Sequence, residues 1–414
     1  MHDKALAEQK LQSALNLTEN LIAGEWPYKD SSEALEAIAN EFRRRLDRIR
    51  GLGDASPEII NHWCADARDL VARYHTFIGV ILRSSNIRNA FESYDPIRSL
   101  ARGLLGDDFK VIIGSEWSYT PFVYPVPIPS LENFIFVGLP ASEAQNALLT
   151  PLAGHELGHA LWKRTEVSAE IRNKVRDDII QSYVGSGPGQ SDLFPYPITM
   201  EEADQDLRLR SNWKKPFEFA IRQCEEIFCD VIACWLFGDS FIQAYRYLTV
   251  PDLKSRPTEY YPTNRTRAEI LHKAGNLFHG RAFALHELFK TNTETQSSDI
   301  RLADEVSRSA VDLIIKTVDE FCNARAELKK PKAENIAACK VSLLRIQPAE
   351  SLNTIADVIC AAWQIRLDLN SWDIAGVNPI KKIDILNDLV FKSFEVNEIR
   401  RIDAEPQGLV DTGK

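Results

Sequence analysis

Two histidines four residues apart are the residues in this chain whose type and spacing most clearly support chemistry. They are His155 and His159, and Glu156 directly follows the first of them. The preceding Thr150-Pro151 is typical of a helix start, with Thr as the N-cap, so both histidines are expected within one helix. A spacing of four places them about 40° apart around the helix axis and one turn apart. Their ring nitrogens can therefore bind a single metal ion, at about 2.0–2.1 Å if the ion is zinc.

Glu156 extends this pair to the pattern His-Glu-x-x-His, which is the arrangement of zinc peptidases. Because Glu156 adjoins the first histidine, its carboxylate can reach a water molecule on the metal rather than the metal itself. Gly154 and Gly158 lie in the same predicted helix. Glycine inside a helix costs up to about 1 kcal/mol relative to alanine, so such positions usually have a packing or functional reason.

A catalytic zinc ion needs a third protein ligand, because three ligands leave one position for water. The candidate lies in a second helix, predicted from Pro216 to about Phe237, where three acidic residues interrupt an apolar stripe: Glu225, Glu226 and Asp230. Acidic side chains in apolar surroundings are costly unless they are paired or bind a metal. Glu226 and Asp230 share a face of this helix, so one can bind zinc while the other orients a ligand histidine.

The sequences His-Glu-Leu-Gly-His at 155–159 and Glu-Ile-Phe-Cys-Asp at 226–230 together resemble the gluzincin group of metallopeptidases, whose second motif is Glu-x-x-x-Asp. The resemblance implies one Zn²⁺ ion, held by His155, His159 and Glu226. It also implies that Glu156 is the general base and that Asp230 orients His155.

The resemblance extends to a strand predicted at 133–139, which in that fold is an edge strand that pairs with extended substrate. Glu226 lies 67 residues after His159, which is much farther than in compact members of the group. Residues 165–215 are therefore expected to be an insertion. Its glycine-rich piece at 185–190 is interpreted as a surface loop, with a lid as the alternative.

The segment at 260–267, Tyr-Tyr-Pro-Thr-Asn-Arg-Thr-Arg, resembles a His-Pro-Pro-x-x-x-Arg segment of some gluzincin relatives, with Tyr261 in place of the histidine. Hydrolysis develops negative charge on the scissile carbonyl oxygen, which a phenol or a guanidinium can stabilise. Tyr261 and Arg267 are therefore candidate catalytic residues. The alternative is an ordinary turn followed by an ion-paired arginine.

Hydrophobic periodicity predicts helices over 6–23, 32–51 and 56–83, short strands at 109–114 and 133–139, and mostly helices from 142 onward. A polar linker is expected at 291–298. The predicted fold is mainly α (α+β), with a zincin-like core and a small β-sheet at 106–290 implied by the resemblance. An N-terminal helical region at 1–105 and a C-terminal helical region at 299–414 flank this core.

Composition limits the classes of partner. The 414 residues carry 49 Lys and Arg against 59 Asp and Glu, a net charge of −10, which argues against nucleic-acid and anionic-membrane partners. The chain has no apolar run long enough to span a membrane, and the segment that follows Met1 is not typical of a secretory signal. Seven cysteines without a Cys-x-x-Cys pair indicate buried thiols and a cytoplasmic location. Cys224, Cys229 and Cys234 advance about 500° per step on one helix and are interpreted as small core residues.

The functional hypothesis is a zinc metallopeptidase that acts on a peptide or protein substrate. One alternative is a deformylase-like amidase, whose third ligand would be an upstream cysteine such as Cys64. Another is a non-catalytic zincin-like protein that binds peptides or serves as a sensor or scaffold, with flanking helices that recruit partners. The oligomeric state and the cleavage preference stay open.

Overall fold

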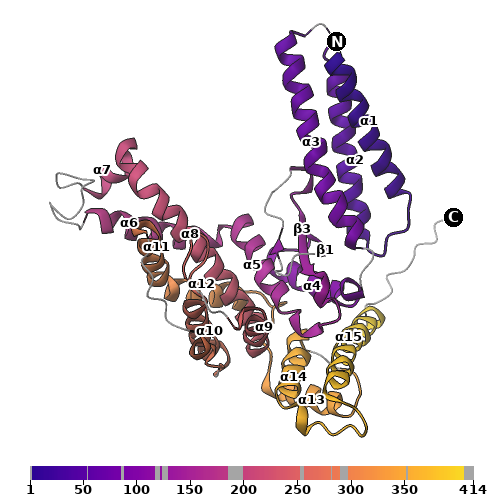
Figure 1. Ribbon diagram of the computed structural model, residues 1–414, viewed down its shortest axis with the longest axis vertical. Helices are drawn as coiled ribbons and strands as arrows, with labels where there is room; N and C mark the ends of the chain where they lie inside the picture. The colour runs from indigo at the N-terminus through magenta and orange to yellow at the C-terminus, as the bar shows by residue number, and fades with distance from the viewer. Residues whose placement is uncertain are drawn as a thin grey trace. The chain divides into compact units, whose positions relative to one another are not determined.

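The computed structural model is mainly helical and contains one small sheet (Figure 1). It describes the whole chain except residues 1, 54, 85–87, 117–121, 124–128, 185–198, 252–255, 281, 290–296, 351–352 and 405–414. The described chain divides into two compact units, Met1–Asn146 and Ala147–Lys414. The mainly helical class with a small sheet is confirmed, whereas the predicted regions 1–105, 106–290 and 299–414 stay a prediction. The glycine-rich piece at 185–190 and most of the polar linker at 291–298 lie outside the described residues.

Three long helices and a shorter one form most of the first unit. Helices α1 (His2–Ile22), α2 (Lys29–Arg50) and α3 (Pro57–Ser84) pack side by side (Figure 1), and α4 (Arg88–Leu105) follows them. The first three lie close to the ranges expected from periodicity. The apolar residues of α2 recur at three- and four-residue intervals and are buried, with Leu35, Ile38 and Phe42 at their centre. Burial of this stripe is what makes the periodic pattern form a helix here.

The sheet of the first unit has three strands in the order β1-β3-β2. Strand β1 (Lys110–Glu116) runs parallel to β3 (Phe134–Pro140), and the two-residue β2 (Phe122–Val123) is antiparallel to β3. Both predicted strands are therefore present. The expectation that 133–139 is an edge strand is wrong, because β2 forms from the proline-rich stretch and pairs with Val137 and Gly138.

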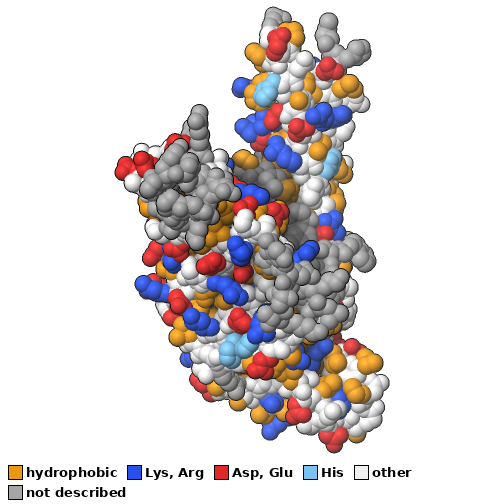
Figure 2. Space-filling model, turned by 60° about the vertical axis from the view of Figure 1, so that its left-hand side comes forward, with side chains coloured by type: hydrophobic (Ala, Val, Ile, Leu, Met, Phe, Trp, Pro, Cys, Tyr) orange, Lys and Arg blue, Asp and Glu red, His pale blue; other side chains and the backbone are white. Residues whose placement is uncertain are grey.

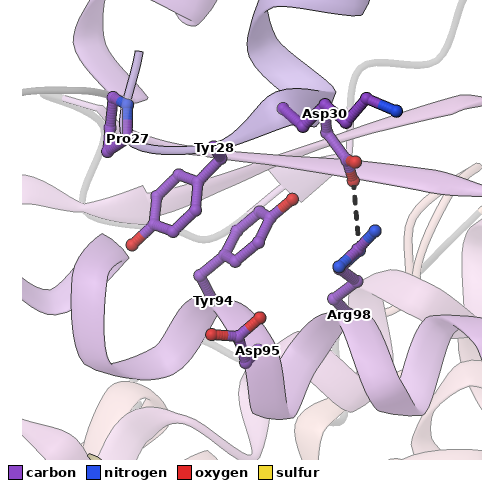
Figure 3. Close-up of a pocket in the computed structure, with 7 residues that line it drawn as sticks. Pro27, Tyr28, Asp30, Tyr94, Asp95 and Arg98 are labelled. Carbon is purple, nitrogen blue, oxygen red and sulfur yellow. Dashed lines mark ion pairs between the residues drawn. The ribbon is translucent and has the colours of Figure 1, made fainter. Parts of the chain in front are cut away.

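A buried carboxylate, that of Asp30, connects three elements of the first unit. Its Oδ2 accepts the backbone N–H of Val111 in β1 at 2.9 Å and lies 3.5 Å from Nε of Arg98 in α4. Tyr28 and Tyr94 stack beside this ion pair with ring centroids 3.6 Å apart, and the group lines a cavity of about 350 Å³ (Figure 3). Asp30 thus fixes α2 and α4 against the sheet.

The second unit is built around α8 (Leu207–Phe237), which contacts α5, α6, α7, α10, α11 and α12. Their bounds are α5 Leu152–Arg164, α6 Ala169–Val184, α7 Met200–Gln205, α10 Asn264–His279, α11 Ser298–Ser309 and α12 Val311–Asn323. The remaining helices of the unit are α9 (Asp239–Thr249), α13 (Ala333–Leu344), α14 (Ile355–Leu367) and α15 (Pro379–Ala404).

Helix α8 begins at Leu207, well before the start predicted at Pro216. A proline inside a helix has no N–H for the carbonyl four residues earlier, which here belongs to Asn212. The hydroxyl of Tyr183 in α6 donates to this carbonyl oxygen at 3.4 Å. The predicted start was therefore wrong because a tertiary hydrogen bond compensates for the proline.

Helix α5 contains both histidines, as predicted, but its N-cap is Pro151 rather than Thr150. The hydroxyl of Thr150 donates to the carbonyl of Ala147 at 2.7 Å, so it does not cap the helix. The backbone N–H of Ala153 and that of Gly154 instead bond to the carbonyls of residues 150 and 151, each at 3.0 Å. The helix therefore begins in a tight turn, which follows the short 3₁₀ segment Ala147–Leu149.

Two glycines let α5 approach α8 closely. A Cβ atom at Gly154 would lie 2.8 Å from the ring of Phe237, and one at Gly158 would lie 2.9 Å from the Cα of Cys229. Real Cβ atoms do not come this near to neighbouring atoms. As positions advance along α5, their contacts move backward along α8, so the two helices are antiparallel. The packing reason expected for these two glycines is thus present.

Further features bear on the expectations from composition. Within the described ranges, no helix combines the length and the apolar character needed to cross a bilayer. All seven cysteines belong to described ranges, and each is a buried free thiol, as predicted. On the face shown in Figure 2, described basic and acidic side chains are interspersed without a continuous basic area. The absence of a nucleic-acid partner stays a prediction.

The close approach at Gly158 predicts opposite effects for two glycine-to-alanine substitutions. Gly158→Ala should lower the free energy of unfolding by about 1–3 kcal/mol, because the added methyl meets the backbone of Cys229. Gly79→Ala in α3 should leave it unchanged or raise it by up to about 1 kcal/mol, since only the end of the Arg83 side chain lies near. Denaturant unfolding measures both. Equal stability of the two variants would contradict the helix contact.

Candidate metal centre

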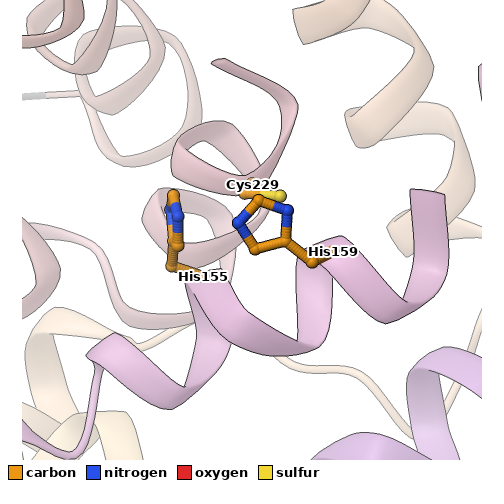
Figure 4. A group of neighbouring side chains, drawn as sticks. All are labelled: His155, His159 and Cys229. Carbon is orange, nitrogen blue, oxygen red and sulfur yellow. The ribbon is translucent and has the colours of Figure 1, made fainter. Parts of the chain in front are cut away.

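The histidines of α5 and a cysteine of α8 form a possible metal site in the second unit (Figure 4). His155, His159 and Cys229 each offer a ligand atom, and these atoms all lie within 4.8 Å of one another. The two imidazole centroids are 5.0 Å apart, with their planes nearly perpendicular at 84°. The spacing of four residues thus brings both rings to one face of α5, as expected.

The carboxylate of Glu226 faces both imidazoles. Its Oε2 lies 3.5 Å from Nε2 of His155, and its Oε1 lies 3.5 Å from Nε2 of His159. Two ligand atoms that share a tetrahedral ion at about 2.0–2.1 Å are separated by about 3.4 Å. Each of these two nitrogen–oxygen separations is close to that value, although they involve different oxygens of Glu226, and the group whose ligand atoms all lie within 4.8 Å of one another consists of both histidines and Cys229.

The other ring nitrogen of His155, Nδ1, is hydrogen-bonded to Asp230. Nδ1–H of the imidazole donates to Oδ1 of Asp230 at 2.9 Å. Because a carboxylate can only accept, this bond places the proton on Nδ1 and leaves the Nε2 lone pair for a cation. The sequence suggested this partner for His155, and the structure brings the two residues together.

His159 has a corresponding partner that the sequence analysis did not assign. Its Nδ1–H donates to Oε1 of Glu225 at 2.7 Å. The signal was present in the spacing, because the four residues from His155 to His159 rise about 6 Å and the five from Glu225 to Asp230 rise about 7.5 Å. The two rises differ by only about 1.5 Å, so in antiparallel helices each histidine can meet one of the two carboxylates.

Arg267 in α10 is buried against Asp230 rather than exposed to solvent. Its Nε donates to Oδ2 of Asp230 at 2.7 Å and its Nη2 donates to Oδ1 at 2.8 Å. The remaining Nη1 lies 3.5 Å from Oε2 of Glu226. The guanidinium therefore contacts both acidic residues that face His155.

Tyr261 is half exposed, and its ring centroid lies 5.9 Å from Cζ of Arg267. Partial burial raises the pKa of its phenol, and the nearby carboxylate of Glu226 raises that pKa further. The phenol is therefore protonated at neutral pH and lies within electrostatic range of the candidate site. This position is compatible with the role expected from the sequence but does not test it.

Glu156 lies between the two histidines in sequence and is only 5% exposed. Its negative charge contributes to raising the pKa of Tyr261 and that of the Cys229 thiol. The structure thus gathers Glu156 with the other predicted site residues in the second unit.

Buried opposite charges set the protonation of the site. Burial alone would lower the pKa of His155, but the hydrogen bonds with Asp230 and Glu226 outweigh burial and raise that pKa to about 10. Burial also opposes ionisation of Asp230, yet Arg267 and His155 lower its pKa to about 2. The pKa of Glu226 is lowered against burial by the same two cationic neighbours. The two carboxylates therefore favour a protonated, positively charged His155 at neutral pH.

Cys229 is fully buried, and burial together with the surrounding carboxylates holds the pKa of its thiol well above the usual range. Its sulfur lies within 4.8 Å of a ligand atom of each histidine and is drawn next to the His159 ring in Figure 4. The sulfur also packs over Gly158. Cys229 is thus both the small core residue expected from the sequence and a possible metal ligand that the sequence analysis missed.

Comparison with known proteins adds no relative: no family model matches the chain, and no curated protein or solved structure matches it.

The raised pKa of His155 predicts that metal binding releases a proton well above neutral pH. The metal-free imidazole is protonated below about pH 10, whereas a metal ligand must be unprotonated at Nε2. At about pH 8.5, an imidazole with the usual pKa of about 6.5 would release almost no proton. Calorimetric titration with Zn²⁺ in buffers of different ionisation enthalpy measures the number released. The folded Asp230→Asn variant should release fewer protons per Zn²⁺ ion bound. Binding of Zn²⁺ by the wild type without proton release would contradict the raised pKa of His155.

Substitutions on α8 separate the two possible donor sets. Glu226→Ala should weaken Zn²⁺ binding by at least about 100-fold, because it removes the carboxylate that faces both imidazoles. Cys229→Ala should retain the ion, and Cys224→Ala is its control because both thiols are fully buried. Metal content after dialysis and a competitive chelator titration provide the measurement. Loss of the ion in Cys229→Ala alone would identify sulfur as a ligand.

Proposed function

We propose that this chain is a zinc-dependent metallopeptidase of the gluzincin type, with a zincin-like core that hydrolyses a peptide or protein substrate. The observation that carries the proposal is the Glu226 carboxylate, whose two oxygens each lie 3.5 Å from Nε2 of a different histidine. Two imidazoles and a carboxylate are a ligand set of zinc sites that keep a fourth position open for water. The motif resemblance supports the same three ligands.

The ligand set favours a transition-metal ion, and the motif resemblance makes Zn²⁺ the proposed one. Imidazole nitrogens suit zinc, copper, iron and nickel, whereas magnesium and calcium prefer oxygen ligands alone. Each imidazole also donates its other N–H to a carboxylate, an arrangement typical of zinc-bound histidine. When bound, Zn²⁺ would lower the pKa of a water molecule and polarise the scissile carbonyl.

Glu156 is the proposed general base. It follows His155 in α5, and its side chain is buried. In this role it accepts a proton from the attacking water and passes that proton to the leaving amine. A protein that only binds a metal does not need a carboxylate at this position, which favours catalysis.

Tyr261 and Arg267 take different proposed roles. The protonated, half-exposed phenol of Tyr261 can donate a hydrogen bond to the carbonyl oxygen as negative charge develops. Arg267 uses its Nε and Nη2 on Asp230, so its proposed role is to position Asp230 and, through it, His155.

Cys229 is the observation that favours a second candidate function. If its sulfur joined the two imidazoles and Glu226, four protein ligands would close the site, which is typical of structural zinc. The chain would then be a non-catalytic zincin-like protein that binds peptides or serves as a sensor or scaffold. The buried carboxylate of Glu156, which directly follows His155, favours the catalytic candidate.

Replacement of the proposed base separates these two functions. Glu156→Gln should retain the bound zinc but lose turnover by about 10²–10⁴-fold, because the amide cannot accept the proton of the attacking water. The measurement is digestion of a peptide library by zinc-loaded protein, with cleavage products identified by mass spectrometry.

The matched control is Glu287→Gln. Glu287 follows His286 in the 3₁₀ segment Leu285–Leu288, as Glu156 follows His155, but it is exposed and is not among the site residues. It should retain full activity. Cleavage by Glu156→Gln at the wild-type rate would refute the mechanism, and a zinc-loaded wild type that cleaves nothing would favour the non-catalytic candidate.

A further inference from the structure

Each histidine of the site donates a hydrogen bond to a carboxylate, and that carboxylate forms an ion pair with a basic side chain. For His155 the series is His155–Asp230–Arg267, with a hydrogen bond of 2.9 Å to the carboxylate and two of 2.7 and 2.8 Å from the guanidinium. Both partner side chains are buried, at 1% exposure for Asp230 and 10% for Arg267. A bidentate guanidinium–carboxylate pair away from water is among the stronger charged contacts in proteins.

For His159 the series is His159–Glu225–Lys163. The imidazole donates to Oε1 of Glu225 at 2.7 Å, and Nζ of Lys163 lies 3.0 Å from the same oxygen. Lys163 follows His159 by four residues on α5, so both side chains lie on one face of that helix. The carboxylate of Glu225 reaches them from α8.

The two series differ in exposure and in the number of contacts. The side chain of Lys163 is 42% exposed and that of Glu225 is 15% exposed, and a single cation–oxygen contact joins them. Exposed lysine–carboxylate pairs are weak and are screened by salt, because water and ions compete for both charges. The orientation of His159 is therefore supported less firmly than that of His155.

We propose that Glu225 and Lys163 are a positioning pair that orients His159, and that a bound metal ion leaves the site through detachment of His159 rather than His155. This inference rests on the metal binding of the proposed function but not on its catalysis. The Lys163–Glu225 ion pair that supports His159 is partly exposed to solvent, so salt should weaken it. The rate of metal release should therefore depend on ionic strength. Lys163 is the source of that dependence.

Metal release from the zinc-loaded full-length chain into a chromogenic chelator tests the inference without measuring activity. The comparison uses salt at about 0.1 M and about 1 M, which shortens the Debye length from about 10 Å to about 3 Å. Wild-type release should accelerate several-fold at high salt. Lys163→Met should release zinc several-fold faster at low salt and lose the salt response, whereas Lys163→Arg should retain it.

Glu225→Gln should accelerate release by about 10- to 100-fold at both salt concentrations, because the amide holds the imidazole less firmly. Absorption spectra of the Co²⁺-loaded variants report the ligand geometry independently of the release rate. The matched control is Lys174→Met on α6, whose lysine is similarly exposed but lies 2.8 Å from Asp178, which is not a site residue. It should behave as the wild type.

Release from Lys163→Met with the wild-type rate and salt response, or from Glu225→Gln at the wild-type rate, would overturn the inference. A wild type that binds no metal would overturn the inference and the proposed function together. A wild type that binds zinc but cleaves no peptide would refute only the proposed function, because the release rates can still be compared.

Discussion

The charge balance between α5 and α8 is the constraint on which the rest of the second unit depends. Asp230 and Glu226 are buried carboxylates, and buried charges are costly unless they are paired or bind a cation. Arg267 contacts both of them, yet their combined charge exceeds what one guanidinium can neutralise. Protonated His155 supplies the missing positive charge in the metal-free chain. A divalent cation between the imidazoles would take over that role from the proton.

This charge balance requires α5 and α8 to lie close together, and the glycines of α5 allow the close contact. Gly158 faces the backbone of Cys229, so the side chains on either side of that contact meet across the interface. His155 meets Asp230 and His159 meets Glu225 because the helices run in opposite directions. A larger residue at position 158 would separate the imidazoles from all three carboxylates at once. The helix contact and the chemistry of the site are therefore one structural requirement.

The sequence predicted most of the long helices and two of the strands, and it singled out most of the residues that meet between α5, α8 and α10, because periodicity and motif spacing are local signals. It predicted the long N-terminal helices and both histidines on one helix face. It could not reveal that β2 would pair with β3, that Tyr183 would compensate for Pro216, or that Arg267 would be used by Asp230. Each of these depends on residues distant in the chain. Glu225 stood out in the sequence as an acidic residue in an apolar helix. Its hydrogen bond with His159 could be recognised only once α8 was seen to run antiparallel to α5.

The antiparallel contact of α5 and α8 has a consequence for the long segment that joins them. The register of the donor groups is set where the glycines meet α8, so the path between the helices does not determine it. Closing a longer connection costs only about 0.6 kcal/mol for each doubling of its length. Helices α6 and α7 can therefore occupy this connection without disturbing the contacts between the histidines of α5 and the acidic residues of α8. Chains with connections of very different length can therefore arrange the same residues in the same way. The number of residues between two motifs says little about whether two proteins are related.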